Sequence, residues 1–137
     1  MHTYRVTVTR DDRWWMVHVP ELMGHVTASG AVNVGDVTQA RRVSEIASQA
    51  RDFICTVTDQ APSAFDMDIT ITVDSIDVTA RAGQVASDRA AAERHAAAAQ
   101  DEARALAREL AKHGIAVRDV GEVLGVSFQR AQQLISA

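Results

Sequence analysis

A long segment without helix breakers constrains this chain more than any other feature of its sequence. Residues 75–113 contain no proline and a single glycine, Gly83, and alanine, arginine and glutamate dominate them. These residue types are strong helix formers, whereas glycine and proline are the poorest. The sequence therefore predicts one helix over residues 75–113, roughly 50 Å long at ~1.5 Å per residue, with Gly83 as the one place where it could break.

The middle of this predicted helix has little to bury. Residues 86–99 contain almost no large apolar side chain, and most helical stability in proteins comes from packing an apolar face. Two interpretations of this stretch stay open. It is either a spacer between folded parts or an alanine-lined seam along which two copies of the chain pair.

The residues before this segment predict a small α+β domain over residues 1–74. Apolar and polar residues alternate in Tyr4–Arg10, which is typical of a half-buried strand, and Pro20 ends the next strand. A helical apolar spacing favours a helix over residues 37–58. The expected order is β-β-β-α-β, with strands at residues 4–10, 14–19, 25–28 and 67–73 and a loop at residues 29–36.

The final segment, residues 114–137, has the pattern of a helix-turn-helix. Gly121 is the small residue needed where the two helices touch, and Gly125 tolerates the positive φ of the turn. Ser127 is a good N-cap for the second helix. Apolar residues stand at the positions that lock the helices together, which are Val120, Leu124, Val126, Ala131 and Leu134. The sequence therefore predicts helices over residues 117–124 and 128–136.

The second of these helices carries the residues that predict DNA binding. The start of such a helix enters the major groove, where arginine suits guanine and glutamine suits adenine. The expected base-reading residues are Gln129, Arg130, Gln132 and Gln133. Ser127 is expected to meet a phosphate at the helix N-terminus, and Arg118 to reach the DNA backbone from the preceding helix. The alternative is an ordinary helical hairpin whose polar residues are only solvated.

The distribution of charge points to more than one copy on the DNA. The chain has a net charge of −4, and residues 1–74 hold six arginines against ten acids. Residues 112–137 hold three basic residues against two acids, a net charge of +1. Because phosphate contacts dominate affinity for DNA, one such module is a weak binder. We therefore expect a homodimer or a larger assembly on an inverted-repeat operator in double-stranded DNA.

The residues of the first 58 positions resemble a HicB-like antitoxin domain. The resemblance rests on the opening strand Tyr4–Thr9, the turn at Asp11–Arg13, the aromatic-led strand Trp15–Val19 and the sequence Pro20-Glu21-Leu22-Met23-Gly24. The final residues are similar to the helix-turn-helix ends of such antitoxins and of small actinobacterial regulators. The resemblance implies dimerisation, repression of the protein's own operon and capture of a small ribonuclease toxin of the HicA type.

Three residues of the second strand predict a surface for a protein partner. Successive side chains of a strand point to opposite faces, so Trp14, Met16 and His18 share one face if Trp15 and Val17 line the core. An exposed tryptophan and methionine on one face suggest a dimer or partner interface. The alternative is that a loop or the long helix covers them.

The rest of the composition argues against several classes of protein. No run of about 20 apolar residues predicts a transmembrane helix, so we expect a cytoplasmic protein without a membrane partner. Cys55 is the only cysteine, and the five histidines lack a metal-ligand spacing, so no metal or cofactor is expected. Nothing indicates an enzyme. The predicted function is a DNA-binding regulator of the antitoxin type; the alternative is a protein-binding adaptor whose helices serve only oligomerisation.

Overall fold

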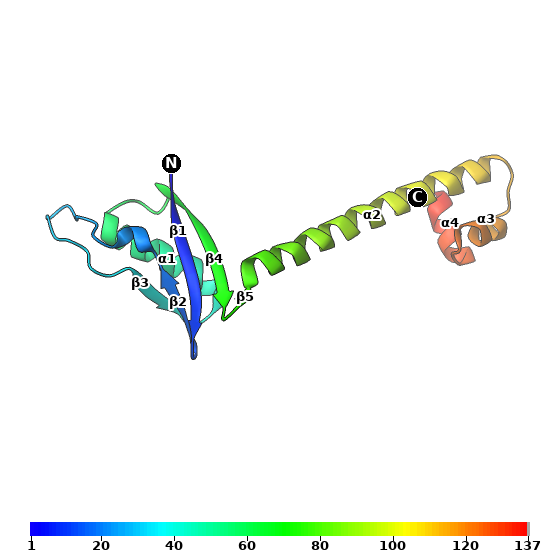
Figure 1. Ribbon diagram of the computed structural model, residues 1–137. Coiled ribbons are helices and arrows are strands. Elements are labelled where there is room, and N and C mark those ends of the chain that lie inside the picture. The colour runs from blue at the N-terminus through cyan, green and yellow to red at the C-terminus, as the bar shows by residue number, and fades with distance from the viewer. Residues whose placement is uncertain (137) are drawn as a thin grey trace. The chain divides into compact units, whose positions relative to one another are not determined.

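The computed structural model describes residues 1–136, and Ala137, the last residue of the predicted helix-turn-helix segment, lies outside the described residues. The predicted α+β class is confirmed by a five-stranded sheet and four α-helices (Figure 1). The chain forms two compact units, Met1–Gly83 and a second that begins at Gln84. The division between them falls inside the long helix α2 (Val78–Lys112).

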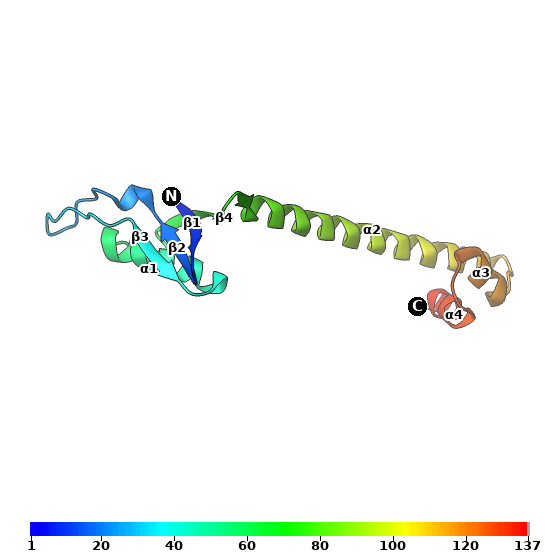
Figure 2. The same cartoon turned by 60° about the horizontal axis from the view of Figure 1, so that its bottom comes forward.

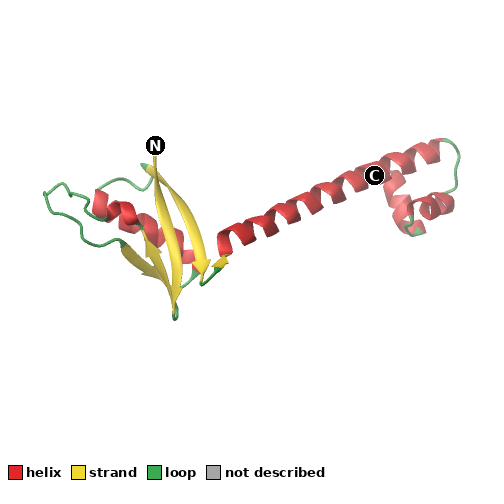
Figure 3. Ribbon diagram, in the orientation of Figure 1, coloured by secondary structure: helices red, strands yellow, loops and turns green. Residues whose placement is uncertain are grey.

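The first unit is a sheet with one helix on one of its faces (Figure 3). Its strands run in the order β3-β2-β1-β4-β5. The strands are β1 (His2–Asp11), β2 (Trp14–His18), β3 (Val37–Ala40), β4 (Phe65–Val73) and β5 (Ile76–Asp77). Strand β1 is central: it pairs antiparallel with β2 along its second half and parallel with β4 along its first half and middle.

The core of this unit lies between the sheet and helix α1 (Val43–Thr58). Alternate residues of the strands point to this side, as the period of two in the sequence requires. Helix α1 contributes Ile46, Ala50 and Ile54, which lie on one stripe because they are four residues apart. The remaining buried residues are Tyr4, Val6, Val8, Val17, Val19, Leu22, Ala40 and Phe65.

The third strand lies later in the chain than predicted. Residues 25–28 do not form a strand, and only Val26 makes an isolated bridge, to Val32. Strand β3 is instead Val37–Ala40, where the apolar spacing predicts the start of a helix. The residues in between fold back on themselves, because Gly24 and His25 each share a 2.7 Å backbone hydrogen bond with Asn33. This loop keeps residues 25–28 out of the sheet.

The predicted helix start at Val37 is therefore wrong. Helix α1 begins at Val43, six residues later, and its N-cap residue Arg42 makes no side-chain capping bond. Thr38 and Ala40 alternate onto the core face beside Val17 and Trp15 of β2. Pairing with β2 outweighs the local helical spacing, as tertiary context often does.

Helix α2 is shorter than the predicted segment at its start and is not broken at Gly83. Asp74 adopts a positive φ of 52° in a turn, and Ile76–Asp77 then pair with β4, so the helix begins only at Val78. It ends at Lys112, followed by Gly114 at φ 79°. Residues 81–90 and 92–99 are all exposed within the described chain. No helix within residues 1–136 combines the length and the apolar character needed to cross a bilayer.

Candidate nucleic-acid interface

The second unit packs two short helices against the last turns of α2. Helix α3 (Val117–Leu124) and helix α4 (Phe128–Ser136) have the predicted bounds, and Figure 2 shows both beside the end of α2. Their core contains the buried residues Ala107, Val120, Ala131 and Leu134. The half-buried residues around it are Ala103, Leu110, Val117, Leu124, Val126 and Ile135. The predicted locking residues thus all lie in or beside one small core.

The turn between α3 and α4 depends on two glycines. Gly121 is buried, and a Cβ atom at this position would lie 3.0 Å from the backbone oxygen of Val126 and 3.6 Å from Cβ of Ala131. Gly125 ends α3 in the left-handed region, at φ 69°. The backbone N–H of Val126 then donates to the Gly121 carbonyl at 2.9 Å. Only a residue without a side chain fits at Gly121 without displacing the turn.

Ser127 fixes the first turn of α4. Its Oγ accepts a hydrogen bond from the backbone N–H of Arg130 at 3.1 Å, which is the bond of an N-cap residue. The side chain is exposed, so its hydroxyl hydrogen is still available to a phosphate oxygen. The other N–H groups of the first turn point toward the start of the helix, where anions bind favourably.

The solvent face of α4 is a stripe of glutamines. Gln129, Gln132 and Gln133 are all exposed, and Gln132 and Gln133 lie three and four residues after Gln129, so both lie beside it on the solvent side of the helix. Arg130 is half-buried, and its Nη1 donates to Oε1 of Gln133 at 3.3 Å. The structure thus brings the four base-reading candidates onto the outer surface of one helix, with two of them hydrogen-bonded to each other.

Positive charge is sparse around this surface. Arg118 is exposed in the first turn of α3, followed at once by Asp119. The cations of residues 112–136 are Lys112, Arg118 and Arg130, against two acids. A surface like this offers few phosphate contacts per copy.

Phe128 is an exposed residue of this surface that the sequence pattern did not predict. It is the first residue of α4 and is 56% exposed. The sequence carries no signal of this exposure, because Phe128 lies three residues before Ala131 and seven before Ile135, a spacing that predicts the same apolar face. The structure nevertheless leaves Phe128 outside the core of this unit, at the first residue of α4.

The first unit presents a second candidate surface, on the sheet face opposite α1. Trp14, Met16 and His18 alternate with the core-facing Trp15 and Val17 and are all half-buried. The guanidinium carbon of Arg41 lies 5.0 Å from the centre of the Trp14 ring, within cation–π range. Part of the tryptophan is thus covered by a neighbouring arginine, and the three side chains remain together on one face.

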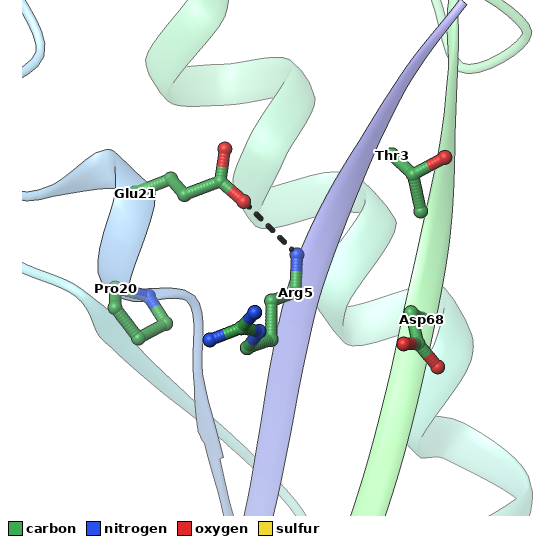
Figure 4. Close-up of a pocket in the computed structure, with 5 residues that line it drawn as sticks. All are labelled: Thr3, Arg5, Pro20, Glu21 and Asp68. Atoms are coloured by element: carbon green, nitrogen blue, oxygen red, sulfur yellow. Dashed lines mark hydrogen bonds between the residues drawn. The ribbon is translucent and has the colours of Figure 1, made fainter.

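A shallow hollow borders the same side of the sheet (Figure 4). It is lined by Thr3, Arg5, Pro20, Glu21 and Asp68 and has a volume of about 380 Å³. The Glu21 carboxylate contacts two residues of β1. Its Oε1 accepts a hydrogen bond from the backbone N–H of Arg5 at 3.1 Å, and its Oε2 lies 2.6 Å from Nε2 of His2. Burial raises the pKa of Glu21, but these two hydrogen bonds and the nearby charges of His2 and Arg5 outweigh it, so its pKa lies below the ordinary value.

This geometry shows why the Pro20–Gly24 sequence matters for the fold. Strand β2 pairs only with residues 7–11 of β1, so the first half of β1 lacks a strand partner on that side. The short helix Pro20–Leu22 occupies this place, and its Glu21 carboxylate accepts the bond that a neighbouring strand would accept. The hollow is therefore built around a structural hydrogen bond.

The described residues do not assemble a metal centre, and comparisons with known proteins add no relative. Within residues 1–136, no group of three or more histidine, cysteine, aspartate and glutamate side chains could hold a metal ion. Comparison with known protein families, with curated proteins and with solved structures gives no match for this chain.

Proposed function

We propose that this protein is a DNA-binding transcriptional regulator that acts in the cytoplasm on double-stranded DNA. The observation that carries the proposal is the close contact of α3 and α4 at Gly121, with a solvent-exposed glutamine stripe on α4. In a helix-turn-helix the second helix lies in the major groove and its first turns contact base edges. An ordinary helical hairpin has no need of three glutamines and a half-exposed arginine on one outer face.

The exposed side chains of α4 match the chemistry of base edges. A glutamine amide can bond both N6 and N7 of adenine, and an arginine can bond both O6 and N7 of guanine. Gln133 already holds Arg130 by a hydrogen bond, which restricts the guanidinium before DNA arrives. Ser127 and Arg118 are proposed to bind phosphate oxygens, Ser127 through its free hydroxyl hydrogen and the start of α4.

The sparse positive charge supports a dimer on an inverted repeat. One helix-turn-helix with a net charge of +1 over residues 112–137 neutralises few phosphates. Two linked copies bind two half-sites with a combined affinity far above that of either one. We propose that the protein is at least a dimer and that it represses its own operon. The exposed middle of α2 supports the spacer and the seam interpretations equally.

The proposal is tested by selecting DNA from a randomised duplex library with the full chain, followed by anisotropy titrations on the enriched sequence. We expect an enriched inverted repeat whose affinity falls steeply with salt. Arg130→Ala should weaken binding by about tenfold or more and relax the preference for guanine at one position of each half-site. Arg94→Ala is the matched control, because Arg94 is an exposed arginine of α2 outside the module.

Two results would contradict DNA binding. One is the absence of any enriched sequence at low salt; the other is an equal effect of Arg130→Ala and Arg94→Ala. Either result favours the alternative function, a protein-binding adaptor. Light scattering coupled to chromatography then distinguishes a dimeric adaptor from a monomer.

The open sheet face supports a second role, capture of a protein partner. Trp14, Met16 and His18 lie together on the face that α1 does not cover. The resemblance to HicB-like antitoxins implies a small HicA-type ribonuclease as that partner. We expect that co-expression with the product of the adjacent reading frame gives a stable complex and relieves its toxicity. Trp14→Ala with Met16→Ala should abolish the complex, whereas Val43→Ala, an exposed apolar residue of α1, should not.

A further inference from the structure

Phe128 is a large apolar side chain that the core of the second unit does not use. It is 56% exposed, whereas Phe65 in the first unit is 1% exposed. Neither the buried core of the second unit nor the half-buried residues around it include Phe128. A partner surface that covers this ring removes apolar area from water, which stabilises the complex. The ring therefore has a free face at one defined position, the first residue of α4.

This position is the end of α4 that a helix-turn-helix directs at base edges. Gln132 lies one turn further along the helix, at i+4 from Phe128, and is also exposed. In the major groove, an apolar side chain recognises the 5-methyl group of thymine, while glutamine recognises N6 and N7 of adenine. The two neighbouring side chains thus match the two kinds of group that an A·T-rich step presents.

We propose that Phe128 reads the 5-methyl group of a thymine, next to an adenine bound by Gln132. This inference rests on the proposed DNA binding and adds a specificity-determining residue to the four polar ones. Cytosine carries hydrogen instead of a methyl group at the same carbon, so the contact selects thymine over cytosine. The ring carries no charge, so it contributes to base choice and leaves the salt dependence of binding unchanged.

The test removes the methyl group from the DNA and the ring from the protein, separately and together. In the enriched duplex, each thymine is replaced in turn by uracil, which differs only by the missing 5-methyl group. We expect one thymine per half-site at which uracil weakens binding of the full chain about fourfold, the factor for burying one methyl-sized group. The Phe128→Ala variant should bind the thymine duplex more weakly than wild type does. It should bind the thymine and uracil duplexes with equal affinity.

Val123→Ala is the matched control, because Val123 is an exposed apolar residue of α3 at 64% exposure. This variant should keep the full sensitivity to uracil. The inference is overturned if no thymine is sensitive to uracil, or if Phe128→Ala keeps the sensitivity. It is also overturned if Phe128→Ala lowers the mass of the protein in solution, since the ring would then serve contact between copies. Failure to enrich any sequence contradicts the proposed function itself, whereas enrichment without methyl sensitivity contradicts only this inference.

Discussion

The carboxylate of Glu21 accepts the backbone N–H of Arg5 at 3.1 Å and thereby takes the place of a missing strand beside β1. Its other oxygen lies 2.6 Å from Nε2 of His2. A carboxylate that accepts such bonds is favoured in its ionised form. The stability that this contact contributes to the sheet therefore depends on pH.

Acid should weaken the first unit through Glu21. Because its pKa is lowered in the folded chain, its contribution to stability is present above the ordinary pKa of glutamate, about 4.3, and is lost as the pH falls through the lower folded value. Glu21→Gln should reduce the free energy of unfolding at pH 7 by about 1 kcal/mol or less, since the pair is exposed to solvent. Urea titrations at pH 7 and pH 3 measure this.

The difference between wild type and Glu21→Gln should shrink toward zero at pH 3. Glu21→Ala should cost more than Glu21→Gln, because the amide oxygen of glutamine still accepts the Arg5 N–H. Glu93→Gln, an exposed glutamate on α2, serves as the control and should have little effect at either pH. A wild-type advantage that persists undiminished at pH 3 would show that charge on Glu21 is not the cause.

Two glycine-to-alanine changes in helices should have opposite signs. Gly121→Ala places a Cβ atom 3.0 Å from the Val126 carbonyl oxygen, a backbone atom that cannot turn away. Such overpacking lowers the free energy of unfolding by about 1–3 kcal/mol. The better helix propensity of alanine offsets about 1 kcal/mol of this loss. Gly83→Ala meets no atom within 4 Å and should stabilise α2 by up to about 1 kcal/mol. Thermal unfolding followed by circular dichroism gives both signs, and equal effects would refute the close approach at Gly121.

Substitutions at Ser127 should separate its structural bond from its proposed phosphate contact. Ser127→Ala removes the cap on Arg130 N–H and should cost about 1 kcal/mol of stability. Ser127→Asp keeps an oxygen acceptor for that bond but adds a negative charge at the proposed phosphate site. We expect wild-type thermal stability for Ser127→Asp together with a loss of DNA affinity in anisotropy titrations. Unchanged affinity would place Ser127 away from the DNA backbone.

The outer edge of β4 should be protected from pairing by its two aspartates. β5 pairs only with Thr72 and Val73, and the N–H of Ile71 donates to Thr79 Oγ1 at 2.7 Å, so residues 65–70 have no strand partner on that edge. Antiparallel pairing of two β4 strands about Met67 sets Asp66 against Asp68 of the other copy, and like charges in this position repel. A pairing of two β4 strands centred closer to Val73 is blocked, because β5 already occupies that part of the edge.

Removing both charges should therefore allow the β4 edges of two copies to pair. We expect Asp66→Thr with Asp68→Thr to form species heavier than wild type, seen by chromatography with mass measurement. Glu93→Gln with Glu102→Gln removes the same charge from α2 and should leave the mass unchanged. Identical masses for all three proteins would mean that Asp66 and Asp68 do not prevent pairing of β4 edges between copies.

Local signals in the sequence were sufficient for the second unit. Gly121, Gly125 and Ser127 each satisfy a local requirement, and the predicted bounds of α3 and α4 are confirmed. These elements are short and contiguous, so each residue's role depends on neighbours within a few positions. The exposure of Phe128 could not be predicted in this way, because its spacing from Ala131 and Ile135 is that of a buried residue.

The first unit was harder to predict because its pairing is not local. The short strand β3 depends on contact with β2, and nothing in Val37–Ala40 distinguishes it from the first turn of a helix. Helix α1 starts after Arg42, which makes no side-chain cap, so the usual marker of a helix start is missing. The bond from Glu21 to Arg5 joins residues that only the folded sheet brings together.

The central position of β1 also sets an order of events during synthesis. Strand β1 meets β2 across a tight turn at residues 12–13, but its parallel partner β4 starts only at Phe65. Long-range pairing is slow because loop closure precedes any gain from contacts. The ribosome must therefore release the chain as far as Ile71 before β4 can complete its pairing with β1, and until then this edge of β1 stays unpaired on the nascent chain. The helices that follow are built from neighbouring residues and can fold as soon as they emerge.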